Sequence, residues 1–107
     1  MQILLLGKDV EEENIRNKVL KIISNEQAMQ IVEYSMDAPR SAYEISTACG
    51  IPLTQVYRWV RKLHSLGFVR ISGATNAAGK KYFMYKSKVK TIRVTLDAIP
   101  GPKLEME

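Results

Sequence analysis

Cysteine and histidine are almost absent from the chain, which contains one of each, Cys49 and His64. A single cysteine excludes an internal disulfide, and a zinc site would need several further ligands. Acid–base or nucleophilic catalysis requires a positioned pair with a third group that orients it, and these two residues belong to separate predicted helices. We therefore expect no enzymatic activity, no metal site and no cofactor.

Long apolar runs are also missing, since no stretch approaches the roughly 18 residues that a membrane span needs. The opening segment, MQILLLG, is too short for a secretory signal and follows no basic region. These absences predict a cytoplasmic protein without a membrane partner. The chain has 107 residues, of which 46% are hydrophobic and 25% charged, so we expect one small domain over residues 1–107.

Acidic residues are absent from residues 45–96, which contain ten lysines and arginines. The flanking segments are net acidic, with charges of −3 for residues 1–44 and −2 for residues 97–107. A basic surface that only improves solubility does not require every acid to be excluded from one block. A surface that meets phosphates does, because each carboxylate there would repel the ligand.

The first third of the chain reads as two helices. Asp9 is a suitable N-cap for the first, whose apolar residues recur at helical spacing as far as Ile23. Ser24, with Gln27 three residues later, has the pattern of a capping box for a second helix that runs to about Met36. The sequence Asp-Ala-Pro then ends it, because proline disfavours helical backbone in the residue before it.

A helix–turn–helix is predicted next. Ser41 and Glu44 form a capping box for a short helix, on which Ala48 is expected to face inward. Gly50 ends this helix, and Pro52 suits the first turn of another, over residues 53–66. At about 100° per residue, the apolar side chains of that helix share one arc. They are Val56, Trp59, Val60, Leu63 and Leu66.

Polar side chains occupy the other face of helix 53–66, which is the sequence's strongest functional signal. Their chemistry suits DNA, because the planar fork of arginine matches guanine or phosphate and hydroxyls and amides meet base edges. The residues expected to read bases, near the N-terminal end of the helix, are Thr54, Gln55, Tyr57 and Arg58. Arg61 and Lys62 are expected to hold phosphate. The alternative is the ordinary polar face of a surface helix.

Extended segments follow this helix. FVRISG and KKYFMYK alternate like the strands of a hairpin joined by ATNAAG, and VKTIRVTL is a third extended run. Lys80 and Lys81, at the hairpin tip, are candidates to reach an adjacent minor groove or its phosphates, although solvated lysines at a turn are equally ordinary. MQILLLG is either a strand or the lead into a helix, and a short acidic tail follows Pro100-Gly101-Pro102.

The segment EISTACGIPLTQVYRWVRKLHSLGFVRI…GKKYFMYK resembles the winged helix-turn-helix core of ArsR-type transcriptional regulators, and VLKIISNEQAMQIVEY resembles the helix before that core. The resemblance covers residues 19–87. It implies a mainly α fold with a small β-sheet (α+β), with three to four helices and a β-hairpin wing. Metal-sensing members carry two cysteines before the recognition helix, where this chain has only Cys49, and the C-terminal strand also departs from the family pattern.

The resemblance implies a sequence-specific regulator of transcription that binds double-stranded DNA. We expect a homodimeric repressor that inserts helix 53–66 into the major groove, with residues 1–18 and 88–107 as dimerisation or flanking elements. The alternative is a winged-helix adaptor that binds proteins and has no specific affinity for DNA. The sequence predicts neither the operator nor a small-molecule effector.

Overall fold

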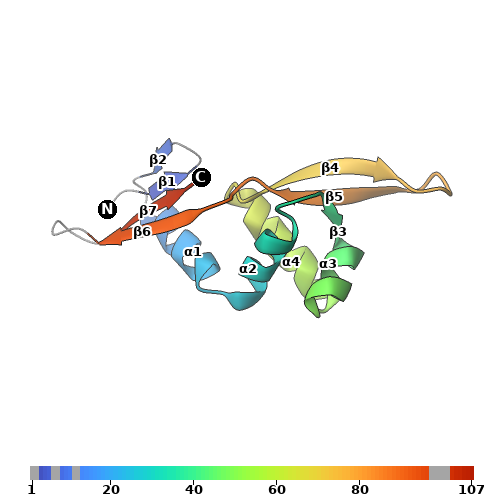
Figure 1. Ribbon diagram of the computed structural model, residues 1–107, viewed down its shortest axis with the longest axis horizontal. Coiled ribbons are helices and arrows are strands. Elements are labelled where there is room, and N and C mark those ends of the chain that lie inside the picture. The colour runs from blue at the N-terminus through green and yellow to red at the C-terminus, as the bar shows by residue number, and fades with distance from the viewer. Residues whose placement is uncertain (1–2, 6–7, 11–12, 97–101) are drawn as a thin grey trace.

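The computed structural model describes residues 3–5, 8–10, 13–96 and 102–107 of an elongated molecule, 57 × 24 × 22 Å in extent (Figure 1). The helices of this part are α1 (Glu13–Ile23), α2 (Glu26–Tyr34), α3 (Ala42–Cys49) and α4 (Leu53–Ser65). The strands are β1 (Ile3–Leu5), β2 (Lys8–Val10), β3 (Arg40–Ser41), β4 (Val69–Thr75), β5 (Lys81–Ser87), β6 (Ile92–Leu96) and β7 (Pro102–Met106). The predicted α+β winged-helix class is confirmed.

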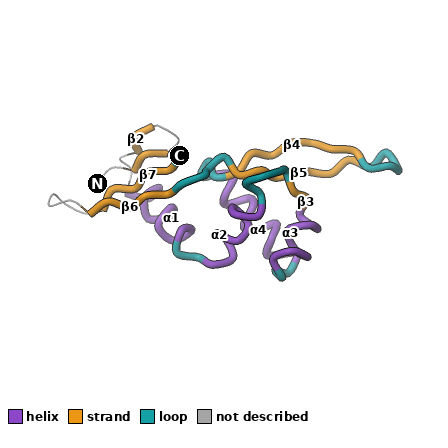
Figure 2. The backbone as a smooth tube through the Cα atoms, in the orientation of Figure 1, coloured by secondary structure: helices purple, strands orange, loops and turns teal. Residues whose placement is uncertain are grey.

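The wing is the hairpin of β4 and β5, which extends beyond the helices at one end of the molecule (Figure 2). With β3 it forms an antiparallel sheet in the order β3-β5-β4. The side chain of Asn76 fixes the tip, because its Oδ1 accepts the backbone N–H groups of Ala78 and Lys80 at 3.0 and 2.9 Å. The tip is therefore a hydrogen-bonded turn rather than an open loop.

A second sheet, in the order β2-β1-β7-β6, carries both chain ends at the pole opposite the wing tip (Figure 1). The predicted extended run VKTIRVTL is confirmed as β6, and residues 3–5 of the opening segment form strand β1, the first of its two alternatives. Residues 102–106, within the predicted acidic tail, form strand β7 between β1 and β6. The backbone of β7 is paired on both sides, by β1 from the other end of the chain and by the preceding strand β6, and this pairing outweighs the low strand propensity of its charged residues. Pro100 and Gly101 lie outside the described residues.

The hydrophobic core lies where α1 to α4 meet the base of the wing. Phe68, Ile31, Ile45 and Leu63 are its largest fully buried side chains. Phe68 also joins α4 to the wing, since its backbone N–H donates to the carbonyl of Leu63 at 2.8 Å. The side chains predicted for the inner face of α4 are buried or packed against this core, namely Val56, Trp59, Val60, Leu63 and Leu66.

Three local predictions about the helices are wrong. Asp9 is not an N-cap, because it lies in β2 opposite Leu4 and α1 begins only at Glu13. Asn25, and not Ser24, caps α2 by accepting the backbone N–H of Ala28 at 3.0 Å, while the Ser24 hydroxyl turns back to the carbonyl of Lys21. Ala48 is exposed rather than inward-facing, because the core side of α3 is made by Ala42 and Ile45.

The turn between α3 and α4 follows the sequence pattern closely. Ser41 and Glu44 exchange the two hydrogen bonds of a capping box, each 3.1 Å long, so that α3 begins where predicted. Gly50 ends α3 in the left-handed region, at φ 67°. The Ser46 hydroxyl donates to the carbonyl of Ile51 at 2.6 Å, and Ile51 itself is buried. These contacts set the angle at which α4 leaves the turn.

Candidate nucleic-acid interface

Helix α4 turns its polar face to solvent because its apolar face is held by the core. Val56, Val60 and Leu63 are at most 3% exposed, which leaves the helix no rotational freedom. Of the predicted DNA-binding residues on α4, all are exposed except Gln55, which is half-buried. They are Thr54, Gln55, Tyr57, Arg58, Arg61 and Lys62. Lys80 and Lys81, on the wing, are also exposed.

One group of these residues meets α2 in a small hollow of about 230 Å³. Gln55, Arg58 and Lys62 line it together with Trp59 and Gln27. The indole Nε1–H of Trp59 donates to Gln27 Oε1 at 3.0 Å, and the Lys62 ammonium lies 5.2 Å from the centre of the indole ring. A cation over an aromatic face at this distance is attracted by the ring. Lys62 is therefore drawn toward the helix surface beside Arg58.

The side-chain oxygen of Gln55 is an unusual feature of this hollow. Gln55 Oε1 is buried and has no hydrogen-bond partner among the described residues. A buried acceptor without a donor raises the free energy of the folded state, and it gains when a ligand or water supplies one. The Gln55 amide is thus the group on this side of α4 that gains most from a new donor.

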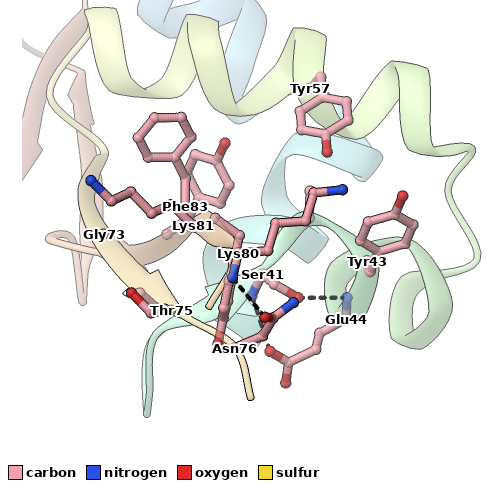
Figure 3. A pocket seen from close by; sticks show the side chains of 14 residues that line it. Ser41, Tyr43, Glu44, Tyr57, Gly73, Thr75, Asn76, Lys80, Lys81 and Phe83 are labelled. Atoms are coloured by element: carbon pink, nitrogen blue, oxygen red, sulfur yellow. Dashed lines mark hydrogen bonds between the residues drawn. The ribbon is translucent and has the colours of Figure 1, made fainter. Parts of the chain in front are cut away.

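A second group faces the wing across a larger groove of about 1010 Å³ (Figure 3). Tyr57 points into it from α4, Tyr43 stands beside it on α3, and Phe83, Lys80 and Lys81 come from the wing. The predicted residues are thus divided between two sides of α4. Thr54 and Arg61 line neither hollow.

Arg61 nevertheless lies close to the base of the wing, as the ionisation of Tyr85 indicates. Burial raises the pKa of the Tyr85 hydroxyl, and neighbouring Tyr57 raises it further, whereas the positive charge of Arg61 opposes both effects. Tyr85 is only 5% exposed and belongs to the core. Tyr57 and Arg61 therefore lie near enough to the Tyr85 hydroxyl to influence its ionisation.

The two arginines of α4 are not neutralised. Among the described residues, neither Arg58 nor Arg61 forms an ion pair, and α3 and α4 contain one carboxylate between them, that of Glu44. That carboxylate lies 3.9 Å from Arg40 and accepts the backbone N–H of Ser41. The N–H donors of both α4 guanidinium groups are consequently available to an anion, in keeping with the acid-free block of the sequence.

Cys49 and His64 lie apart from this interface. The Cys49 thiol is half-buried, with its sulfur 3.8 Å from the carbonyl of Gln30. Burial, and secondarily the charge of Glu33, raise its pKa, so the reactive thiolate is disfavoured. His64 is exposed near the end of α4. Within the described ranges, no group of three or more His, Cys, Asp or Glu side chains is arranged to hold a metal ion.

Residues 35–90 match the family model described as "Sugar-specific transcriptional regulator TrmB". The matched segment is about half of the chain and contains α3, α4 and the whole wing. The chain belongs to the TrmB family. In this TrmB-family chain, the matched region contains every residue that lines the larger groove and all residues of the smaller hollow except Gln27 of α2.

One solved structure similar to this chain is a "possible transcriptional regulator" from Methanosarcina mazei Go1. The two chains are 18% identical, and the match covers 84% of this chain and 76% of the other. They superpose with a TM-score of 0.58, so the likeness shows a shared fold. No curated protein matches the chain. In the described part of the chain, no helix is both long and apolar enough to cross a membrane. Membership of this family supports a DNA-binding transcriptional regulator and points to a non-enzymatic role.

Three residues beside the predicted ones were not expected from the sequence. Gln27 reaches Trp59 only because α2 packs against α4, and no pattern in the sequence around Gln27 predicts that contact. Tyr43 and Phe83 had a weak signal, since each is an aromatic residue at a position that the helix or strand period does not require to be buried. Their exposed fractions, 70% and 64%, mark them as candidates for contact with a ligand.

Proposed function

We propose that the protein is a sequence-specific regulator that binds double-stranded DNA as a homodimeric repressor and inserts α4 into the major groove. The observation that carries the proposal is the exposed face of α4, where Arg58 and Arg61 lie without ion pairs among the described residues. An apolar interface would remove water from both guanidinium groups without offering them acceptors, which is costly. Guanine edges and phosphates supply those acceptors.

We assign roles to the individual residues by their position along α4. Thr54, Gln55, Tyr57 and Arg58 belong to its first two turns and read base edges. In this assignment the Gln55 side chain turns outward on binding, and its Oε1, which is buried without a partner in the free protein, accepts from an adenine or cytosine amino group. Arg61 and Lys62 hold phosphate. Lys80 and Lys81 at the wing tip reach the neighbouring groove or its backbone.

Two copies associate through the terminal sheet in this proposal. Strands β2 and β6 lie at its edges, and an edge strand offers unpaired backbone groups to a second chain. A twofold dimer would present two α4 helices to half-sites about one helical turn, or about 34–36 Å, apart. Within the winged-helix regulators, the ArsR-type resemblance of the sequence stays a prediction, because the matching family model is that of TrmB.

The test begins with selection of bound sequences from random duplex DNA at two salt concentrations. On the selected site, Arg58→Ala/Arg61→Ala is expected to lower the affinity at least about thirtyfold, because each arginine contributes about 1–3 kcal/mol of contact energy. The affinity is measured by fluorescence anisotropy at fixed salt. The charge-matched control is Lys88→Ala/Lys90→Ala, which removes two exposed lysines that line neither hollow and should have a much smaller effect.

Equal losses in the two double variants would contradict the assignment to α4, because they would show a response to net charge alone. A chain that selects no sequence and has no salt-dependent affinity for any duplex would favour the adaptor function instead. Circular dichroism of each variant shows whether its helix content is the same as that of the parent chain.

A further inference from the structure

We propose that the groove between α3, α4 and the wing binds a single strand of DNA with unpaired bases. The groove shares Tyr57, Lys80 and Lys81 with the proposed duplex contact, whereas Tyr43 and Phe83 belong to the groove alone. The proposal rests on three features of the groove: aromatic side chains in its walls, lysines on the wing, and a single carboxylate whose charge is partly offset by Arg40.

The aromatic walls come from three different elements. Tyr43 on α3 is 70% exposed, Tyr57 on α4 is 42% exposed and Phe83 on β5 is 64% exposed, and all three line the groove (Figure 3). Tyr82 on β5, which is 40% exposed, lines it as well. Aromatic side chains normally supply burial to a core, so four exposed rings around one hollow indicate a surface that a ligand covers. Base–aromatic stacking is the interaction in which such rings accept any nucleobase.

The register of the wing explains why Phe83 is bare. Phe83 lies directly opposite Gly73 across the β4–β5 pair, and partners in an antiparallel pair project on the same face. Gly73 has no side chain with which to cover the ring, and a Cβ added to it would meet no atom within 4 Å. Two residues further along β5, Tyr85 shares this face but is opposite Ile71 and is buried. On this face of β5, the ring of Phe83 is thus exposed to the groove, whereas that of Tyr85 is buried.

The charge of the groove favours a phosphate-containing occupant. Lys80 and Lys81 line it at the wing. Its one carboxylate, that of Glu44, accepts the Ser41 N–H at 3.1 Å and lies 3.9 Å from Arg40. These contacts offset part of the repulsion that Glu44 would exert on an anion. Flat apolar rings combined with lysines match the bases and phosphates of a nucleic-acid strand.

Unpaired bases fit this groove better than a duplex does. In a duplex, the faces of each base are covered by its neighbours in the stack, so rings set in the walls of a groove cannot reach them. An unpaired base exposes its face. The groove volume of about 1010 Å³ is at the upper end of the range of about 300–1,000 Å³ for pockets that hold drug-sized ligands, so it has room for more than one nucleotide.

The experiment measures the anisotropy of a labelled oligothymidine of about 12 nucleotides, titrated with the full chain. Phe83→Ala and Tyr43→Ala are each expected to weaken binding about tenfold, which corresponds to about 1.4 kcal/mol. Phe83→Trp and Tyr43→Phe should keep most of the affinity, because each retains a ring. Ile71→Ala is the matched control, since Ile71 is an exposed apolar residue of the same hairpin that does not line the groove.

A duplex of the selected operator, titrated in parallel, separates this activity from the proposed regulatory function. Arg58→Ala should weaken duplex binding far more than oligothymidine binding, and Phe83→Ala the reverse. Absence of oligothymidine binding at low salt, with duplex binding intact, would overturn the groove proposal and leave the regulator intact. Two further outcomes would also overturn it. One is an equal loss of affinity for both probes in Phe83→Ala, and the other is unchanged oligothymidine binding in Phe83→Ala/Tyr43→Ala.

Discussion

At the scale of the residue, Gly50 decides how α3 passes into α4. Its φ of 67° lies in the left-handed region, where a side chain clashes with its own backbone. Nothing lies within 4 Å of a Cβ built at this position, so the neighbours do not contribute to the cost of a substitution. The requirement for glycine is therefore one of backbone conformation alone.

Gly50→Ala is expected to lower the free energy of unfolding by about 1–2 kcal/mol, the cost of placing an L-residue in the left-handed region. Urea denaturation followed by circular dichroism measures it. Gly73→Ala is the matched control, because Gly73 also has open space around it but lies in a strand without a positive φ. That variant should be close to neutral, and a loss there as large as at Gly50 would contradict the backbone explanation.

At the scale of the element, the wing is a two-stranded hairpin with an ordered tip. Its strands pair over their whole length, from Val69 opposite Ser87 to Thr75 opposite Lys81. The Asn76 side chain then orders the turn through two hydrogen bonds. Lys80 and Lys81 are consequently presented at a defined place relative to α4. Such an arrangement reduces the entropy that a flexible basic loop would lose on binding.

Lys80→Ala/Lys81→Ala is expected to weaken operator binding evenly across sequences and to make the slope of log affinity against log salt shallower by about 2, one for each phosphate contact. Anisotropy titrations over a range of salt concentrations give the slope. Lys88→Ala/Lys90→Ala removes the same charge elsewhere and should leave the slope nearly unchanged. A double wing variant with the parental slope would show that the tip does not touch the DNA backbone.

At the scale of the whole molecule, two sheets lie at opposite poles, with the helices between them (Figures 1 and 2). The wing sheet adjoins the basic face of α4, and the terminal sheet contains both ends of the described chain. The separation allows one pole to pair with a second copy while the other meets DNA. A small domain buries a modest core, so association would also add to its stability.

Sedimentation of the full chain is expected to show a dimer, and its melting temperature should rise with protein concentration, because dissociation accompanies unfolding. A chain shortened to residues 13–93, which lacks β1, β2, β7 and the last three residues of β6, should sediment as a monomer while it keeps its helical circular dichroism. Arg58→Ala/Arg61→Ala, with the terminal sheet intact, should stay dimeric. A full chain that sediments as a monomer at every concentration would refute the dimer.

The sequence alone determined what depends on neighbours in the chain. The period of Val56, Val60 and Leu63 specifies the buried face of α4, and hence the exposed one, because a helix has a fixed twist. The capping box at Ser41 and the alternation in the wing are equally local. Charge is additive, so the acid-free block could be read directly and predicted where a basic surface would lie. The fold class and the positions of the α4 and wing residues followed from these patterns, whereas their contacts with DNA stay predictions.

Tertiary structure decided whatever depends on partners distant in the sequence. Residues 102–106 become a strand because β1 and β6 pair with them on both sides, although their own composition indicates a tail. Gln27 reaches Trp59 only through the packing of α2 on α4. Phe83 and Tyr85 lie on the same face of β5 with the same pattern, yet Tyr85 is 5% exposed and Phe83 64%. Period alone cannot tell these two rings apart, because what covers one and leaves the other bare comes from the strand opposite and from the helices above.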